Sequence, residues 1–317
     1  MNTADDLAGQ RILVTGASGF VGSQVCRALE DFSIDLHATS RTRIQENKDA
    51  THVWKADLLD IENARKLFKE IRPDIVIHLA GYPVGTQELD SVAPTFLNNL
   101  CVTVNLLTAA VEVGCKRMVL NASLEQPDYN GSNNTASSPY GASKLCETIY
   151  GKMFRNVFKI PLTIVRPFMT YGPRQQERNV IPYVIRSLLS GNTPKIQSGE
   201  RQIDWIFVDD VVQGVIAAAA TPGADGHTLD LGSGSVTSIR IIVDKLVGII
   251  NPAITPTFMD TRPRKNEIVR SANIGPSAEI LGWKPTHTLD EGLQKTVDWF
   301  RKKNHERAQL ENRNSLK

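Results

Sequence analysis

A tyrosine and a lysine four residues apart are the side chains of this sequence best suited to proton transfer. Tyr140 and Lys144 lie at the start of an expected helix, where a spacing of four places both on one face. A free tyrosine, with a pKa of about 10, is a poor base at neutral pH, but a nearby ammonium favours the phenolate and lowers that pKa. Such a tyrosine can exchange a proton with a substrate oxygen while a hydride moves to or from a nicotinamide. The same spacing is also common on surface helices, so the pair needs support from other residues.

A serine and a glycine-rich loop supply that support. Ser123 follows an expected strand over residues 118–121, where its hydroxyl can hydrogen-bond the same substrate oxygen or merely stabilise a turn. A strand over residues 12–15 runs into three glycines spaced three apart, and a helical pattern follows them. That order lets a backbone approach a pyrophosphate at a helix N-terminus. The residues expected to cradle it are Gly16, Ser18, Gly19, Phe20, Val21 and Gly22.

The end of the second expected strand indicates which dinucleotide this loop would hold. An acidic residue there hydrogen-bonds the adenosine ribose and repels a 2′-phosphate, whereas an arginine attracts that phosphate. The sequence has no acid at this point and carries Ser40, Arg41 and Arg43 instead. We therefore predict a preference for NADP over NAD, with NAD still possible. The alternative interpretation is a solvated basic turn.

Composition excludes several classes of partner. The 317 residues carry 36 basic and 34 acidic side chains, and this near-balance gives no reason to expect nucleic acid. The N-terminus has no signal-peptide pattern, and no apolar run is expected to cross a bilayer, so we expect no membrane partner. The four cysteines are scattered without a CxxC pair, which favours a reducing cytoplasm, four small buried side chains and no metal site.

Strand and helix patterns alternate through the first half of the chain. This alternation predicts an α/β fold of the Rossmann type, a doubly wound parallel sheet with a smaller interleaved C-terminal substrate lobe. We divide the chain into a dinucleotide-binding domain, residues 1–166, and a mainly substrate-binding lobe, residues 167–317, with some segments returning to the sheet. The charged tail from Arg301 onward is expected to be a solvated helix end or disordered. Strands are expected at 12–15, 36–40, 75–79, 118–121 and 162–166, helices at 61–70, 94–113 and 140–158, and a strand-into-helix unit at 206–220.

Motifs in a fixed order make the chain resemble the extended short-chain dehydrogenase/reductase family, in its nucleotide-sugar epimerase, dehydratase and 4-keto reductase branch. The resemblance covers residue 12 to about residue 299. The matching segments are the glycine loop, Asp57-Leu58, His78-Leu79-Ala80-Gly81, Asn99 with Thr103 and Asn105, the trio Ser123, Tyr140 and Lys144, Arg166-Pro167-Phe168, Tyr171-Gly172-Pro173-Arg174, Asp204 to Asp210, and Leu281-Gly282-Trp283-Lys284-Pro285.

The resemblance implies roles for these residues. Tyr140 would be the acid/base, Lys144 its tuner and a ribose contact, and Ser123 the anchor for the substrate oxygen. Glu125 would lie where the family's dehydratases place a carboxylate that moves a proton beside a transient ketone, although many epimerases and reductases carry the same glutamate. The resemblance also implies a homodimer paired through the helices at 94–113 and 140–158. Further cofactor contacts would come from Asp57, Leu58, Leu79, Ala80, Gly81, Asn99 and Pro167.

Departures from the family pattern fall mainly on the substrate side. Met169 replaces an asparagine that often touches the substrate, Ile203 replaces an arginine, and the segment after Glu125 is reshaped. Arginines suit a diphosphate because their planar fork makes two hydrogen bonds at once. The candidates for that role are Arg174, Arg201, Arg262 and Arg264.

These residues lead to one preferred function and two alternatives. We expect an NADP-linked enzyme that moves hydride at C4 of a nucleotide-diphosphate sugar, with a lean toward a 4-keto sugar reductase. Reduction, epimerisation and dehydration all stay open. The alternatives are a reductase of a small non-nucleotide carbonyl compound and a non-catalytic NADP-binding regulator, which is ranked last because Tyr140 and Lys144 are both present.

Overall fold

A seven-stranded parallel sheet forms the centre of the molecule. The structure is a computed structural model that describes residues 3–41, 51–127, 135–259 and 269–315. The strand order is β10-β6-β5-β4-β1-β2-β3, and every neighbouring pair is parallel. The expected doubly wound parallel sheet is thereby confirmed. The strands are β1 (Arg11–Thr15), β2 (Asp35–Ser40), β3 (Thr51–Lys55), β4 (Ile75–His78), β5 (Arg117–Asn121), β6 (Leu162–Pro167) and β10 (Thr228–Leu231).

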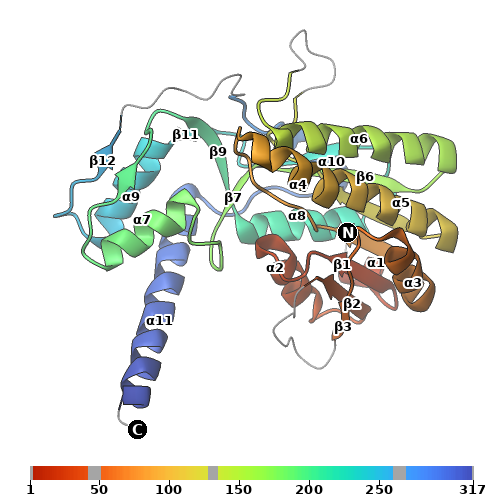
Figure 1. The fold of residues 1–317 in the computed structure, drawn as a ribbon, viewed down its shortest axis with the longest axis horizontal. Helices are drawn as coiled ribbons and strands as arrows, with labels where there is room; N and C mark the ends of the chain where they lie inside the picture. Colours follow the sequence, from red (N-terminus) through yellow and green to blue (C-terminus); the bar gives the residue numbers. More distant parts are fainter. Residues whose placement is uncertain (1–2, 42–50, 128–134, 260–268, 316–317) are drawn as a thin grey trace.

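Helices cover both faces of this sheet (Figure 1). Successive residues of a strand point to opposite faces, so Leu13 joins one apolar core while Ile12 and Val14 join the other. The first core lies under α3 (Ile61–Ile71), α5 (Val102–Val113) and α6 (Pro139–Phe158). The second lies under α1 (Thr3–Leu7), α2 (Phe20–Leu29) and α8 (Val208–Ala220).

The helix expected at 94–113 is the larger part of a longer helical stretch. It starts with η1 (Leu89–Ser91) and α4 (Val92–Thr95), passes through the π-helical segment η2 (Phe96–Cys101) and continues as α5. It ends at Gly114, whose φ of 72° closes the last turn in a left-handed conformation that glycine adopts readily.

This helical stretch corrects one expectation from the sequence. Leu89–Val113 is long and apolar enough to cross a bilayer by length and composition, with a mean hydropathy of 1.4. One such helix is weak evidence for a membrane span, because a helix packed into a protein core passes the same test. Here Leu106, Leu107 and Ala110 are fully buried within the core that also includes residues of α3 and α6.

The C-terminal part combines small sheets with helices. The strand-into-helix unit expected at 206–220 is β9 running directly into α8, whereas β10 returns to the central sheet. The proposed division of the chain at residue 166 stays a prediction. The last helix leaves the body of the molecule and carries the C-terminus (Figure 1). The elements are β7 (Met169–Tyr171), α7 (Val180–Leu189), β8 (Lys195–Ile196), β9 (Gln202–Phe207), β11 (Val236–Ser238), α9 (Ile239–Ile250), β12 (Thr257–Phe258), α10 (Ile274–Leu281) and α11 (Leu289–Ser315).

The strand order creates a crevice at the carboxyl ends of the central strands. The chain passes from β1 to β2 on one side, and β4 later pairs with β1 on the other, so the direction of winding reverses next to β1. Ligands of open α/β sheets bind outside the carboxyl ends of the strands at such a reversal. The last residues of β1, β4 and β5 at this crevice are Thr15, His78 and Asn121.

Candidate functional site

A cavity of about 570 Å³ lies at the carboxyl ends of these strands. Its lining brings together residues from the glycine loop, from the ends of β2 and β4, from the segment after β5 and from the start of α6. The residues predicted from the sequence that line it are Gly16, Ser18, Gly19, Phe20, Val21, Gly22, Ser40, Arg41, Asp57, Leu58, Leu79, Ala80, Gly81, Ser123, Glu125, Tyr140, Pro167, Met169 and Arg201.

The glycine loop packs too tightly for any larger residue at two positions. Gly16 has a φ of +71°, and a Cβ there would lie 2.6 Å from the backbone nitrogen of Ala80. A Cβ on Gly22 would lie 2.2 Å from the carbonyl oxygen of Gly16. The loop therefore presents bare backbone to the cavity and lets α2 start close to the sheet. This cradle fits the pyrophosphate of a dinucleotide.

The end of β2 carries hydroxyl and guanidinium groups. Ser40 Oγ lies 2.6 Å from Ser18 Oγ, and the Arg41 guanidinium donates to Asn98 Oδ1 at 2.6 Å. Arg43, the third residue predicted for this corner, lies outside the described residues.

Local helix chemistry places Tyr140 in the first turn of α6. The Ser138 side chain caps the helix by accepting the N–H of Gly141 at 3.0 Å, and Pro139 opens the first turn, where its fixed φ suits a helix. A Cβ on Gly141 would lie 2.6 Å from the Glu125 carbonyl oxygen, so glycine lets this turn press against the segment after β5. Ser138 also donates to Glu125 Oε2 at 3.1 Å, which holds that carboxylate at the cavity wall.

Ser123 and Lys144 meet around the Tyr140 side chain. Ser123 Oγ accepts the N–H of Glu125 at 3.1 Å, and Ser123 and Tyr140 both line the cavity. The Lys144 ammonium lies 6.0 Å from the centre of the Tyr140 ring and donates to the Asn121 carbonyl oxygen at 2.8 Å. Burial raises the pKa of Tyr140 above its ordinary value, although Lys144 and Ser123 both act to lower it. Lys144 thus acts to lower the pKa of Tyr140, as expected, but in the free protein burial raises that pKa by more.

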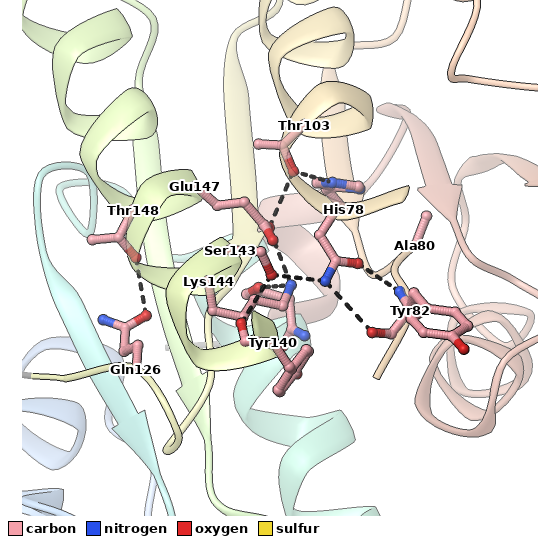
Figure 2. Close-up of polar contacts among 12 residues, drawn as sticks. His78, Ala80, Tyr82, Thr103, Gln126, Tyr140, Ser143, Lys144, Glu147 and Thr148 are labelled. Atoms are coloured by element: carbon pink, nitrogen blue, oxygen red, sulfur yellow. Dashed lines mark hydrogen bonds and ion pairs between the residues drawn. The ribbon is translucent and has the colours of Figure 1, made fainter. Parts of the chain in front are cut away.

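A chain of hydrogen bonds runs behind Lys144 (Figure 2). Lys144 Nζ lies 3.1 Å from Glu147 Oε2, and the Thr103 hydroxyl donates to the same oxygen at 3.1 Å. His78 bridges Thr103 at 2.9 Å and Thr15 at 2.7 Å through its two ring nitrogens. Burial lowers the pKa of His78 to about 3, with a smaller contribution from Lys144, so this imidazole is neutral near pH 7.

Asn99 lies behind the cavity wall and is not among the lining residues. Its side chain is fully buried in η2, where Oδ1 accepts the N–H of Tyr82 at 2.6 Å and Nδ2 donates to Ser143 at 2.9 Å. Asn99 therefore ties the segment after β4 to α6, which contributes Tyr140 and Lys144.

Of the arginines predicted to bind a diphosphate, the structure places one in the cavity lining and one outside it. Arg201 lines the cavity, but Arg174 is exposed and is not among the lining residues. Partial burial of the Arg174 side chain lowers its pKa, and the charge of Arg27 on α2 adds to that effect. Arg262 and Arg264 lie outside the described residues.

Two further arginines were missed from the sequence. Arg178 lines the cavity in the segment before α7. Arg270 donates from the C-terminal part to the carbonyl oxygens of Leu124 and Gln126, and so holds the segment that carries Glu125. Neither arginine lies in a motif quoted for the resemblance, although the charge of Arg178 close to Arg174 was a usable signal. Among residues 3–41, 51–127, 135–259 and 269–315, no group of three His, Cys, Asp or Glu side chains is placed to hold a metal ion.

Comparisons with known proteins agree with this geometry. The model of the NAD dependent epimerase/dehydratase family matches residues 12–232. A UDP-glucose 4-epimerase of Mycolicibacterium smegmatis is 33% identical over 92% of this chain and 99% of its own. A dTDP-glucose 4,6-dehydratase of Haemophilus influenzae is 26% identical over 91% of this chain and 97% of its own.

A solved structure gives the same result in three dimensions. UDP-glucuronic acid 4-epimerase of Bacillus cereus, in complex with UDP-glucuronic acid and NAD, superposes with a TM-score of 0.82. It is 26% identical, and the match covers 92% of this chain and 99% of that one. The fold agrees with these matches in its strand order, its glycine cradle and the cluster of Ser123, Tyr140 and Lys144. The chain therefore belongs to the NAD-dependent epimerase/dehydratase family, the nucleotide-sugar branch of the extended short-chain dehydrogenase/reductase enzymes.

Proposed function

We propose that this enzyme moves hydride at C4 of a nucleotide-diphosphate sugar and that Tyr140 exchanges the proton at the C4 oxygen. The observation that carries the proposal is that Tyr140 and Ser123 line the same cavity as the glycine loop, with the Lys144 ammonium 6.0 Å from the centre of the Tyr140 ring. Ser123 would hold the C4 oxygen, and Lys144 would favour the phenolate when Tyr140 gives up its proton. Glu125 is the remaining cavity carboxylate near the trio and a candidate for proton transfer at a neighbouring carbon.

A nicotinamide dinucleotide fits the cradle made by Gly16, Gly19 and Gly22. When bound, it would supply the hydride acceptor and donor. Ser40 and Arg41 at the end of β2 support NADP, because a guanidinium and a hydroxyl can bind a 2′-phosphate that a carboxylate would repel. The Bacillus cereus relative was solved with NAD, so the two cofactors need direct comparison.

Binding of the two reduced cofactors tests this preference. We expect NADPH to bind more tightly than NADH. The substitution Arg41→Ala should weaken NADPH binding by about tenfold, the cost of one lost charged hydrogen bond, and leave NADH binding nearly unchanged. Dissociation constants from fluorescence titration provide the measurement, and tighter binding of NADH by the unaltered protein would contradict the preference.

The substrate class rests on cavity residues and on the relatives. Arg201 and Arg178 line the cavity and can pair with a diphosphate, whose two charges suit the guanidinium fork. The relatives named above act on UDP- and dTDP-linked sugars. Met169 lies in the lining, and its thioether sulfur is only a weak hydrogen-bond acceptor for a sugar hydroxyl.

The nucleotide released on denaturation distinguishes a reductase from an epimerase. A reductase consumes NADPH, and the basic end of β2 supports that reaction, whereas the match to the Mycolicibacterium enzyme supports epimerisation. We expect the purified protein to carry no stoichiometric nucleotide and to bind added NADPH. Release of one NAD or NADP per chain would instead mean a cofactor retained through the reaction cycle, which favours an epimerase or dehydratase.

We also propose a homodimer formed through α6 and the helical stretch beside it. Large apolar side chains are exposed on both elements, including Phe96 at 52%, Val157 at 61% and Phe158 at 49%. A second copy that covered these side chains would remove apolar surface from water.

A further inference from the structure

We propose that Glu147 is a positioning residue of this active site, which holds the Lys144 ammonium behind Tyr140 and offsets part of its charge. The inference deepens the proposed function and rests on it for the role of Tyr140. It concerns the basicity of the tyrosine, which is a separate property from the identity of the substrate.

The buried Glu147 side chain pairs with Lys144 and is held by Thr103. Its side chain is 1% exposed and that of Lys144 is 4% exposed, so water screens their 3.1 Å ion pair very little. Only Oε2 is engaged, by Lys144 and by Thr103, while the buried Oε1 has no hydrogen-bond partner among the described residues. A half-satisfied buried carboxylate is costly for stability alone, so an apolar or amide side chain would serve packing as well or better.

The protons of the chain behind Lys144 can be assigned. Thr103 has one hydroxyl proton and donates it to Glu147 Oε2, so His78 Nε2 must donate to Thr103. The neutral imidazole then accepts at Nδ1 from the Thr15 hydroxyl, whose oxygen accepts the N–H of Ala80. This single arrangement requires Glu147 as an acceptor. It ends at the backbone of Ala80, so it acts as an anchor for the carboxylate and not as a path for protons to solvent.

The neighbouring charges leave Glu147 as the main opponent of Lys144. The titratable groups facing Tyr140 and Lys144 are Glu147 on α6, Glu125 on the segment after β5 and His78 at the end of β4. His78 is neutral, and η2 and α5 contribute the uncharged Asn99 and Thr103. Burial works to lower the pKa of Lys144, but attraction by Glu147 and Tyr140 outweighs it and holds that pKa above its usual value. Burial also raises the pKa of Glu147, and Lys144 and Thr103 oppose that rise by favouring the charged carboxylate. Among the forces on Tyr140, burial raises its pKa most, and Glu147 adds to the rise more than Glu125 does.

Titration of Tyr140 in three variants tests the inference. Glu147→Gln keeps the shape of the side chain and removes its charge, so the ammonium acts on Tyr140 without opposition. We expect the pKa of Tyr140 to fall by about one unit, read from tyrosinate absorbance. Subtracting the same titration in a Tyr140→Phe background isolates Tyr140 from the other five of the six tyrosines. Glu147→Asp, with a shorter carboxylate, should shift the pKa in the same direction by less.

Thr148→Val is the matched control. Thr148 is the next residue on α6, is 5% exposed and hydrogen-bonds Gln126 at 3.1 Å (Figure 2), but has no contact with Lys144 among the hydrogen bonds described. It should lower stability and leave the pKa of Tyr140 unchanged. An unchanged pKa in both Glu147 variants, or an equal shift in Thr148→Val, would overturn the inference.

The readout separates this inference from the proposed function. Tyrosinate absorbance needs no substrate, so the shift can be seen even if no nucleotide sugar is turned over. Conversely, turnover of a nucleotide sugar by the unaltered enzyme stands whatever Glu147 does. With an active substrate, the limb of the pH profile of kcat/KM assigned to Tyr140 should move in Glu147→Gln by the same amount as the absorbance titration.

Discussion

Tyr140 lines the cavity together with Ser123, and the Lys144 ammonium lies 6.0 Å from the centre of its ring, so removal of the Tyr140 hydroxyl should separate chemistry from binding. Tyr140→Phe should lower kcat by about 10²- to 10⁴-fold, the usual contribution of a positioned acid/base, and leave the cofactor dissociation constant unchanged. Turnover assays and cofactor titration on the same preparation measure both quantities.

Tyr150→Phe provides the control for that experiment. Tyr150 lies on the same helix, is 40% exposed and is not among the residues that line the cavity. Its loss should leave turnover near that of the unaltered enzyme. Unchanged turnover in Tyr140→Phe would remove Tyr140 from the acid/base role.

His78 should make the stability of the fold depend on pH. Its pKa is lowered by burial from 6.5 to about 3 in the folded chain, so the unfolded chain binds the extra proton between these values. Stability from this residue is therefore complete above about pH 6.5 and is lost as the pH falls, by roughly 1.4 kcal/mol for each unit below that point. Urea unfolding at pH 7.0 and at pH about 5.5 should show the loss.

His78→Gln isolates that contribution from other titrating groups. A glutamine can hydrogen-bond but takes up no proton in this range, so the difference between the two pH values should shrink in the variant. Equal pH dependence in the two proteins would show that the buried imidazole is not responsible.

At the scale of elements, the glycine loop depends on backbone shape and on close approach. Gly16→Ala would force a Cβ against the backbone of Ala80 in a left-handed conformation, and neither atom can move without shifting β1 or the end of β4. We expect a stability loss well above 1 kcal/mol and loss of NADPH binding. Urea unfolding and cofactor titration report the two effects.

Gly9→Ala is matched to Gly16→Ala in backbone conformation only. Gly9 has a φ of +69°, but a Cβ there would meet nothing within 4 Å. Its substitution should cost only the roughly 1 kcal/mol of left-handed strain and leave NADPH binding intact. If both variants behaved alike, the close approach at Gly16 would be irrelevant.

At the scale of the whole molecule, the apolar surface on η2 and α6 predicts its assembly. Phe96 and Phe158 are about half exposed. The double substitution Phe96→Glu and Phe158→Glu should convert a dimer into a monomer, because carboxylates are strongly disfavoured in a buried interface. Light scattering coupled to size-exclusion chromatography gives the mass of each protein, and a monomeric unaltered protein would contradict the assembly.

The sequence by itself determined five of the seven strands of the central sheet. These five strands and the helices α3 and α6 were expected within a few residues of their observed bounds, since buried parallel strands are apolar along their length and helices repeat every 3.6 residues. β3 and β10 were missed. β3 mixes polar residues with apolar ones, and β10 follows β6 only after the long intervening segment 168–227, so its place next to β6 depends on long-range packing.

The tertiary structure decided how the candidate residues combine. Sequence spacing could place Tyr140 and Lys144 on one helix face, but only packing brought Thr15, His78 and Thr103 to Glu147, from two strands and a second helix. Packing also determined the pKa of Tyr140, which burial raises by more than Lys144 lowers it. It placed Arg178 in the cavity lining and left Arg174 out of it. Periodicity reveals which face of an element is buried, whereas the dielectric surroundings and partners of a charge depend on elements distant in the chain.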